Sequence, residues 1–396
     1  MSKIKEVSLF VLICLFFCFS QNDLAIAQAA TVVSDEAKED LWQDVRSVPP
    51  VEAAESYEQQ NRKRYDKLVT LVDGLGAGVD RIDHRVLDRG VGQEQAIPNI
   101  VFKVGTGVKP TIVVGAHLDK VAEVGTGVID DWTGCANIIH TAKLLLAQDS
   151  LEHNFVFVCF AYEEKSLWGS QTFVNDLKLQ RNTDLEKLVG GLSNIKAMIN
   201  FECLGVSELY GWKEGSTVML TDIATAVSNS IAGVNFTNRD IGLPVGADSV
   251  PFFYEGIPCV TIDSLKVPDD FSKIHSALDD LSEVREAKIK STLEFSFCYL
   301  LKLDSTLGLD FVKTGFTRSF LEPPERSASV RFESFGHSFH THKPNRVSGD
   351  QSKFASSASS RSELLAVELN GKTFVVWLNA NGKLRKLEVQ KIPDFP

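Results

Sequence analysis

The sequence predicts an α/β protein with three layers, in which helices cover both faces of a mixed, mostly parallel central sheet. A small β-rich extension follows at the C-terminus. From residue 111 onward, short continuous apolar runs alternate with amphipathic segments, which is typical of buried parallel strands separated by helices. After residue 363, apolar and polar residues alternate around Asn370-Gly371 and Asn381-Gly382, which favours short hairpins.

The individual elements follow from their hydrophobic periodicity. Buried strands are expected at residues 111–116, 155–162, 195–201, 217–220 and 258–262. Two more strands, 81–87 and 97–104, are expected as a half-solvated antiparallel pair because residues 99–104 alternate. Apolar residues at helical spacing predict helices over residues 52–73, 135–146 and 284–303.

The N-terminal residues 1–29 have the features of a signal peptide. Lys3 and Lys5 precede the apolar run 9–19, and small residues follow at the spacing of a cleavage site: Ala25, Ala27 and Ala29. The run is about half of the roughly 20 residues that a membrane-spanning helix needs. We therefore expect export, to the periplasm or the medium, rather than a stable membrane anchor.

The rest of the chain divides by composition. A main domain is expected over residues 30–310, since a single core grows to about 250 to 300 residues. Residues 326–362 are rich in Ser, Arg and His, with almost no aliphatic pattern, and a linker is expected over residues 311–362. Residues 363–396 would form a small hairpin-like module. The oligomeric state stays open.

Charge and cysteine content narrow the function classes. The net charge is −11, whereas nucleic-acid binding needs a basic surface, so no nucleic-acid partner is expected. Beyond the signal, the cysteines are odd in number and lack C-x-x-C spacing, so we expect buried thiols. They are Cys135, Cys159, Cys203, Cys259 and Cys298. A metal site would have to use histidines and carboxylates.

Acidic residues and histidines follow four of the predicted strands. In chain order they are His117 and Asp119, Glu163 and Glu164, Glu202, and His275. Asp130 lies in the loop before the helix that follows the strand 111–116. Because the carboxyl ends of strands meet at one edge of an open α/β sheet, these side chains are expected to converge. Histidines with carboxylates form the donor set expected for one or two zinc ions.

Several stretches in this order carry a family resemblance. They are Gly115-Ala116-His117-Leu118-Asp119, Asp130-Asp131-Trp132-Thr133-Gly134, Ala161-Tyr162-Glu163-Glu164 followed by Gly169-Ser170, Asn200-Phe201-Glu202, Ala247-Asp248 to Phe252 followed by Gly256-Ile257-Pro258, and His275. Over about residues 98–305 the chain resembles the secreted bacterial zinc aminopeptidases, relatives of glutamate carboxypeptidase II and glutaminyl cyclase. Several motifs in order are a specific signal, whereas one alone is weak.

The resemblance implies a site with two zinc ions. Asp130 would bridge both ions, His117 and Glu202 would complete the site of one, and Glu164 and His275 would complete the other.

Glu163 would stay free as the general base beside a water that the two ions activate. Asp119 would accept the second ring N–H of His117. The substrate would be the N-terminus of a peptide or protein, with its amine bound by acidic groups near the metals.

The chain departs from the family pattern at two positions. Glu202 stands where such aminopeptidases usually have Asp, which lengthens that arm by one methylene. Ile274 stands where many relatives have Tyr or Trp, so another donor would have to stabilise the oxyanion. The candidates are Tyr254, Tyr210 and Ser249.

The walls of the substrate pocket are expected to come from loops at the edge of the sheet that carries the predicted ligands. Residues 178–194 and 205–216 are expected to form walls of the substrate pocket. No role is expected for His140, His153 or His337.

The sequence thus predicts an exported zinc metallopeptidase, an aminopeptidase that uses Glu163 as its base. Two alternatives remain: a glutaminyl cyclase-like acyltransferase with a single zinc, and a catalytically silent binding protein on the same scaffold. Retention of both histidines and three metal-binding carboxylates favours hydrolysis. The side-chain preference, and the choice between aminopeptidase, dipeptidase and carboxypeptidase, stay open.

Overall fold

The computed structural model divides into two compact units. One comprises residues 1–241 and 245–314, and the other comprises residues 242–244 and 315–396. The structure describes residues 33–52, 55–86, 96–121, 125–213, 215–240 and 246–307, together with five short strands between residues 331 and 388. The predicted signal peptide and His337 lie outside these residues. No helix in the described part is long and apolar enough to cross a membrane.

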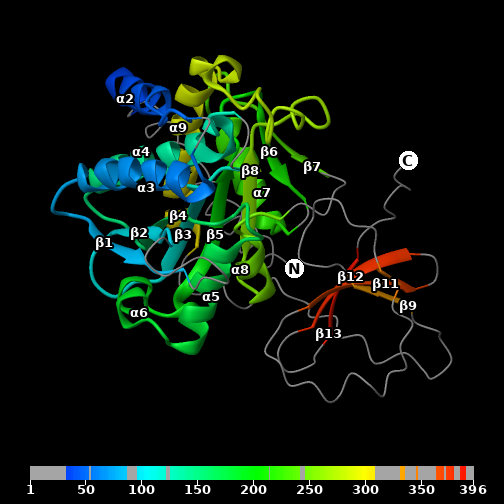
Figure 1. Cartoon of the computed structure of the whole chain (residues 1–396). Coiled ribbons are helices and arrows are strands. Elements are labelled where there is room, and N and C mark those ends of the chain that lie inside the picture. The colour runs from blue at the N-terminus through cyan, green and yellow to red at the C-terminus, as the bar shows by residue number, and fades with distance from the viewer. Residues whose placement is uncertain are drawn as a thin grey trace, which may run out of the picture. The chain divides into compact units, whose positions relative to one another are not determined.

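An eight-stranded mixed sheet forms the centre of the first unit (Figure 1). Its strands in chain order are β1 (Asp80–His84), β2 (Asn99–Val104), β3 (Thr111–His117), β4 (Asn154–Phe160), β5 (Ile195–Glu202), β6 (Leu209–Trp212), β7 (Phe236–Arg239) and β8 (Cys259–Asp263). Their order in the sheet is β1-β2-β4-β3-β5-β8-β6-β7. The strands β4, β3, β5 and β8 at its centre run parallel, while β1 and β2 form the predicted antiparallel pair.

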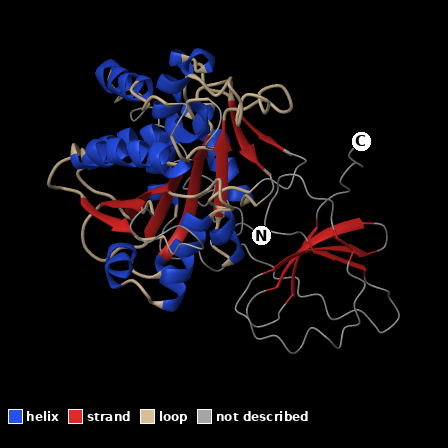
Figure 2. Ribbon diagram, viewed as in Figure 1, coloured by secondary structure: helices blue, strands red, loops and turns tan. Residues whose placement is uncertain are grey.

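Helices cover both faces of this sheet (Figure 2). On one face lie α2 (Asp35–Arg46), α3 (Tyr57–Asp73), α4 (Thr133–Leu146), α7 (Val218–Ser228) and α9 (Glu286–Thr306). On the other lie α5 (Trp168–Leu179), α6 (Thr183–Val189) and α8 (Val250–Tyr254). In β3, Ile112 and Val114 join the first core and Val113 joins the second, so the strand is apolar throughout. The predicted three-layer fold is confirmed.

The prediction of a strand at residues 217–220 is wrong. Thr217 has extended backbone angles at the start of α7, and the helix runs from Val218 to Ser228. The apolar run is short, and periodicity alone does not separate a buried strand from the first turn of a buried helix. The helix buries Leu220, Ala224 and Val227 at helical spacing.

Several other elements were not predicted. The strands β6 and β7 have only four residues each, too few for a clear alternation. Helix α2 lies before the first predicted helix, and it buries only Leu41 and Val45.

The segment 178–194 contains α6 and lies at the amino end of β3, where Thr111 Oγ1 donates to the Val189 carbonyl at 2.7 Å. It is therefore at the edge of the sheet opposite the predicted ligands, and the expectation of a pocket wall is wrong there.

The second unit contains a five-stranded antiparallel sheet in the order β10-β9-β11-β12-β13. Its strands are β9 (Arg331–Ser334), β10 (Asn345–Arg346), β11 (Glu363–Leu369), β12 (Lys372–Leu378) and β13 (Leu384–Glu388). Strands β11 and β12 pair up to Leu369 and Lys372, on either side of Asn370-Gly371. Strands β9 and β10 lie within the segment that was predicted to be a linker.

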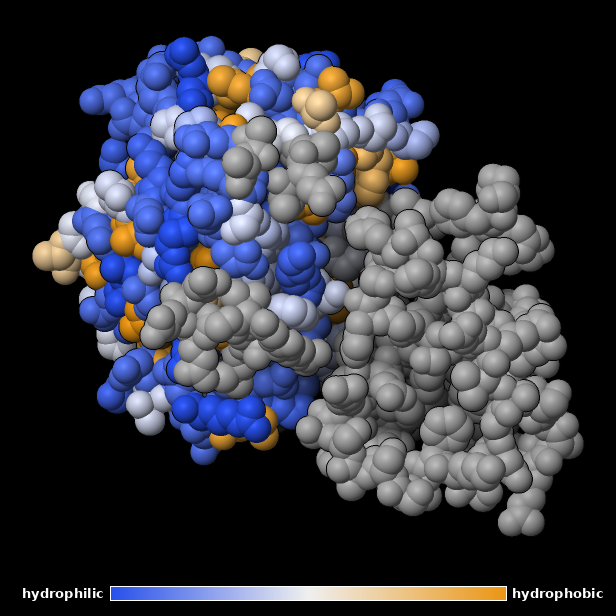
Figure 3. Space-filling model, in the orientation of Figure 1, coloured by the Kyte–Doolittle hydropathy of each residue, from blue (hydrophilic) through white to orange (hydrophobic). Residues whose placement is uncertain are grey.

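The surface of the first unit is mainly hydrophilic on the face seen in Figure 3, with hydrophobic residues scattered singly. Among the described residues, the large hydrophobic side chains that are exposed are Val108, Leu179, Val218 and Leu278. The five cysteines beyond the predicted signal are all buried and free, as predicted.

Gly169 illustrates how closely the helices approach the sheet. It lies in the first turn of α5, where a Cβ atom would clash with the Ala161 carbonyl oxygen and lie 2.9 Å from the Ala161 nitrogen.

We expect Gly169→Ala to lower the free energy of unfolding by about 1–3 kcal/mol, because rigid backbone has to move. Urea denaturation measures the change. Gly78→Ala is the matched control, since its Cβ would meet only the Leu146 side chain at 3.7 Å; equal stability of the two variants would contradict the prediction.

Candidate metal centre

The carboxyl ends of the four parallel strands bring the predicted residues to one edge of the sheet. His117 and Glu202 are the last residues of β3 and β5. Glu163 and Glu164 follow β4, and the chain that leaves β8 leads to His275. This is the edge where ligands collect in open α/β folds, because loops of different strands meet there.

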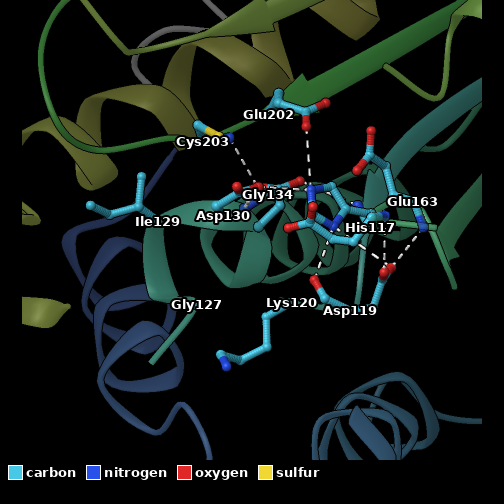
Figure 4. A network of polar contacts seen from close by, with 12 residues as sticks. His117, Asp119, Lys120, Gly127, Ile129, Asp130, Gly134, Glu163, Glu202 and Cys203 are labelled. Atoms are coloured by element: carbon cyan, nitrogen blue, oxygen red, sulfur yellow. Dashed lines mark hydrogen bonds and ion pairs between the residues drawn. The ribbon is translucent and has the colours of Figure 1, made fainter. Parts of the chain in front are cut away.

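The first group of potential metal ligands consists of His117, Asp130 and Glu202, which are all buried. His117 Nε2 lies 2.9 Å from Asp130 Oδ1 and 3.3 Å from Glu202 Oε1. Figure 4 shows the three side chains pointing toward one another. In this chain the longer Glu202 side chain reaches the group from the end of β5.

The second group consists of Asp130, Glu164 and His275. His275 Nε2 lies 3.1 Å from Asp130 Oδ2 and 3.0 Å from Glu164 Oε2. Asp130 therefore presents one carboxylate oxygen to each group, Oδ1 to the first and Oδ2 to the second. Such a carboxylate can bridge two cations.

The electrostatics of Asp130 and its histidines are strongly coupled. Burial opposes ionisation of Asp130, but hydrogen bonds from His117 and His275 outweigh burial and lower its pKa. Hydrogen bonds to Asp130 and then Glu164 raise the pKa of His275 to about 11. When protonated, the two histidines thus offset the negative charge of Asp130.

Glu163 belongs to neither group, although it lines the same cleft. Burial raises the pKa of its carboxyl group well above the usual range, and the neighbouring Glu202 and Glu164 carboxylates add to the shift, while His117 opposes it. A carboxylate that lies in the cleft but outside both groups of potential ligands is free to accept and return a proton.

Asp119 makes contacts that differ from the prediction. The ring nitrogen Nδ1 of His117 lies 3.0 Å from the Asp119 backbone carbonyl oxygen, but 3.8 Å from the Asp119 carboxylate. The carboxylate instead accepts hydrogen bonds from the backbone N–H groups of Glu163 and Glu164, at 3.0 and 3.1 Å. The main chain therefore fixes the tautomer of His117, while the side chain orients the acidic pair.

Two buried aspartates that received no role from the sequence hold the segment around Asp130. Asp131 accepts hydrogen bonds from the backbone N–H groups of His117, Gly134 and Cys203, at 3.2, 3.0 and 3.0 Å. Asp279 accepts one from the N–H of Ile129 at 2.8 Å. The adjacent acids Asp130-Asp131 were visible in the sequence, but which of them binds the backbone depends on tertiary contacts.

The cleft beside the two groups has both acidic and apolar walls. Its apolar residues are Trp212, Leu265, Phe271 and Ile274. Trp212 comes from the segment 205–216, as predicted for a pocket wall, and its Nε1 donates to the buried carboxylate of Asp263 at 2.7 Å. Asp263 also pairs with Arg239.

The three candidate oxyanion donors lie elsewhere. Among the described residues that line the cleft, Tyr210, Tyr254 and Ser249 are absent. Ser249 instead shares a hydrogen bond of 2.7 Å with Thr261.

The histidines expected to have no role pair with structural acids: His140 Nε2 lies 2.8 Å from Asp44, and His153 Nδ1 lies 3.1 Å from Asp304.

The two groups fit zinc by their chemistry. Each combines one histidine nitrogen with carboxylate oxygens, which are donors that zinc accepts, and leaves room for a non-protein ligand. Three carboxylates close together in a buried site also need cations to offset their mutual repulsion.

Comparison with known proteins agrees with the fold. Residues 99–297 match the model of Peptidase family M28. The LapA aminopeptidase of Legionella pneumophila has a similar structure, with 17% identity and a TM-score of 0.60 over 71% of this chain and 75% of that chain. LapB from the same organism is also similar, with 16% sequence identity and a TM-score of 0.53 over 71% of this chain and 75% of that chain. The glutaminyl cyclase of Macrostomum lignano has 16% sequence identity and a TM-score of 0.52 over 70% of this chain and 92% of that chain. A comparison with curated protein sequences finds no match.

The contacts of Asp131 lead to a prediction. The side-chain amide nitrogen of asparagine cannot accept a hydrogen bond, so Asp131→Asn leaves at least one buried N–H without its acceptor. We expect a loss of about 1–3 kcal/mol in the free energy of unfolding, together with weaker zinc binding, measured by urea denaturation and by competition with a chelator. The control is Asp304→Asn, because Asp304 binds the backbone of Glu152 and His153 away from the site. It should destabilise the fold without changing zinc binding; equal zinc affinity in both variants would refute the role of Asp131.

Proposed function

Because the chain belongs to peptidase family M28, we propose that it is an exported zinc aminopeptidase that releases residues from the N-termini of peptides. The observation that carries the proposal is the carboxylate of Asp130, which presents one oxygen to each of two groups that contain a histidine and a second acid. Residues 1–29 would direct export, and residues 30–310 would form the catalytic domain.

These contacts support a proposal for the residues that would hold the two zinc ions. Asp130 would bridge them, with His117 and Glu202 on one side and Glu164 and His275 on the other. When bound, the ions would polarise the scissile carbonyl group and make water acidic enough to react near neutral pH.

Glu163 would act as the general base and then as the general acid. It lies in the cleft outside both groups, so its carboxylate would stay free to exchange a proton with water and substrate. The proton that Glu163 accepts from the attacking water would pass to the nitrogen of the leaving peptide. The N–H groups of Glu163 and Glu164 are both held by Asp119, so the base and the neighbouring ligand are oriented together.

The acidic lining of the cleft supports recognition of a free amine. Glu163 lines it without belonging to either group of potential ligands, and no basic side chain other than His275 is among its described lining residues. The charge of Asp263, which also lines the cleft, is offset by Arg239. A positively charged N-terminus is therefore a better match for this cleft than a free carboxylate.

Two alternatives make different demands on the same residues. A glutaminyl cyclase-like acyltransferase would need one zinc, and it would act on N-terminal glutamine. A silent binding protein would need no base. The presence of two groups around a shared Asp130 favours the peptidase.

The decisive experiment uses the purified mature chain with a panel of aminoacyl p-nitroanilides. We expect hydrolysis of unblocked substrates, loss of hydrolysis after chelation, recovery on addition of about two equivalents of zinc, and no cleavage of N-acetylated substrates. Glu163→Gln should lower kcat by about 10²- to 10⁴-fold while zinc is still bound, because only the proton acceptor is lost.

Glu152→Gln, at an exposed position away from the cleft, is the control and should retain full activity. Cleavage of blocked substrates alone would contradict the aminopeptidase proposal. Cyclisation of an N-terminal glutaminyl peptide with one zinc would establish the acyltransferase. Complete inactivity with both zincs bound would favour the binding protein.

Zinc binding should depend on pH through both histidines. Although burial opposes it, hydrogen bonds to Asp130 and Glu202 raise the pKa of His117 well above its usual value. The second histidine is His275. Its pKa of about 11 means that zinc has to displace a proton from the imidazole at neutral pH. Between about pH 6 and about pH 8, each proton that zinc displaces should make the zinc affinity rise about tenfold for every unit of pH. Competition titration at several pH values measures this rise. The stability of the fold without zinc should change with pH in the opposite direction. The ion pairs of His275 contribute their full stabilisation below about pH 6.5, and this stabilisation is lost as pH rises through about 11.

His140→Gln is the control for this titration, because His140 pairs with Asp44 outside the site. The variant should retain the pH dependence of the wild type. A zinc affinity that does not change with pH would show that His275 is not protonated in the metal-free site.

A further inference from the structure

Helix α3 packs against the metal centre although it lies outside the segment that matches the family model. Its residues Tyr57, Asn61, Arg64 and Leu68 are buried and follow one another at spacings of four, three and four residues. Residues at these spacings share one face of a helix. This face of α3 is directed at the chain that leaves β3 and at the loop that follows β4.

Asn61 and Arg64 bind the main chain just beyond His117. The Asn61 side chain makes two hydrogen bonds with Lys120, one to its carbonyl at 3.1 Å and one from its N–H at 3.0 Å. The Arg64 guanidinium donates to the carbonyls of Leu118 at 2.6 Å and Gly127 at 3.0 Å. Arg64 thus links the chain after His117 to the chain before Asp130.

Tyr57 reaches the acidic pair from the same helix. Its hydroxyl group donates to Asp119 Oδ2 at 2.6 Å. Its ring stacks on Tyr162, with the centroids 6.0 Å apart, and the ammonium group of Lys165 lies 4.6 Å from the ring centroid. Tyr162 and Lys165 are the residues on either side of Glu163-Glu164.

The hydroxyl group of Tyr57 therefore acts on the acidic pair through Asp119. The Asp119 carboxylate accepts three hydrogen bonds, from Tyr57 and from the N–H groups of Glu163 and Glu164. Oδ2 takes two of them, from Tyr57 and Glu164, and Oδ1 takes the one from Glu163. Without the hydroxyl, the carboxylate could rotate, and the backbone of the acidic pair would lose its fixed acceptor.

We propose that Tyr57 is a positioning residue of the metal centre: through Asp119 it fixes the backbone that carries Glu163 and Glu164. The inference rests on the proposed function, because it assigns the acidic pair to catalysis and metal binding. Tyr57 itself does not line the cleft. Its loss should therefore affect the orientation of the base and of one metal ligand, and leave substrate contacts intact.

The test compares Tyr57→Phe with Tyr65→Phe. Both tyrosines lie on α3 and are similarly buried, at 7% and 8% exposure, but Tyr65 packs under Arg62 away from Asp119. Phenylalanine keeps the ring contacts with Tyr162 and Lys165, so the fold should persist. We expect Tyr57→Phe to lower kcat and zinc affinity by about 10- to 100-fold with little change in KM, as loss of an outer partner of a metal site does.

A readout independent of turnover is amide hydrogen exchange of the metal-free protein. In Tyr57→Phe, the amides of Glu163 and Glu164 should exchange faster than in the wild type, whereas Tyr65→Phe should leave them unchanged. Wild-type exchange, kcat and zinc affinity in Tyr57→Phe would overturn the inference. Equal changes in both variants would also overturn it, since they would reflect a general loosening of α3. A wild-type protein that binds no zinc and cleaves no peptide would instead refute the proposed function, while the exchange comparison would still test the coupling of Tyr57 to the acidic pair.

Discussion

The burial of several carboxylates within one small volume is the constraint on which the rest of the site depends. Asp130, Glu163, Glu164 and Glu202 line one cleft, and Asp130 touches both histidines. Ionised carboxylates that are removed from water repel one another and lose hydration, and each effect costs several kcal/mol unless cations or hydrogen-bond donors compensate. The surrounding structure is organised to provide this compensation.

Compensation comes from two sources. Histidine side chains, and the metals proposed to replace their protons, supply positive charge next to the cleft. Behind this layer, a second set of aspartates accepts backbone N–H groups: Asp119 from the acidic pair, Asp131 from the chain at His117, Gly134 and Cys203, and Asp279 from Ile129. These acids bind the backbone at His117, at the acidic pair and beside Asp130 and Glu202, so main-chain hydrogen bonds help to orient the proposed ligands there.

The scaffold explains why these loops can be held so firmly. The central strands are buried on both faces, and their carboxyl ends lie side by side, so residues far apart in the chain begin from fixed neighbouring positions. In the parallel ladder, His117 pairs with Phe160 and Glu202 pairs with Asp263. Helix α3 then adds contacts from a part of the chain that precedes the sheet. The rigid core and the hydrogen-bonded loops together give a preorganised site.

The sequence by itself determined the layered fold, most of the central strands, and the six side chains that meet at one edge. It could do so because buried strands are apolar throughout and because a histidine or an acid stands at or just after their carboxyl ends, as at His117, Glu164 and Glu202. It did not determine β6, β7 or the helical nature of residues 218–228, since short apolar runs fit both a strand and a helix. Only the tertiary structure decided that the Asp119 side chain binds the backbone of Glu163 and Glu164, that Asp131 supports the chain behind Asp130, and that Tyr57 joins this network. Such hydrogen bonds join residues distant in the chain, and their geometry depends on how helices and loops pack, which local sequence patterns do not encode.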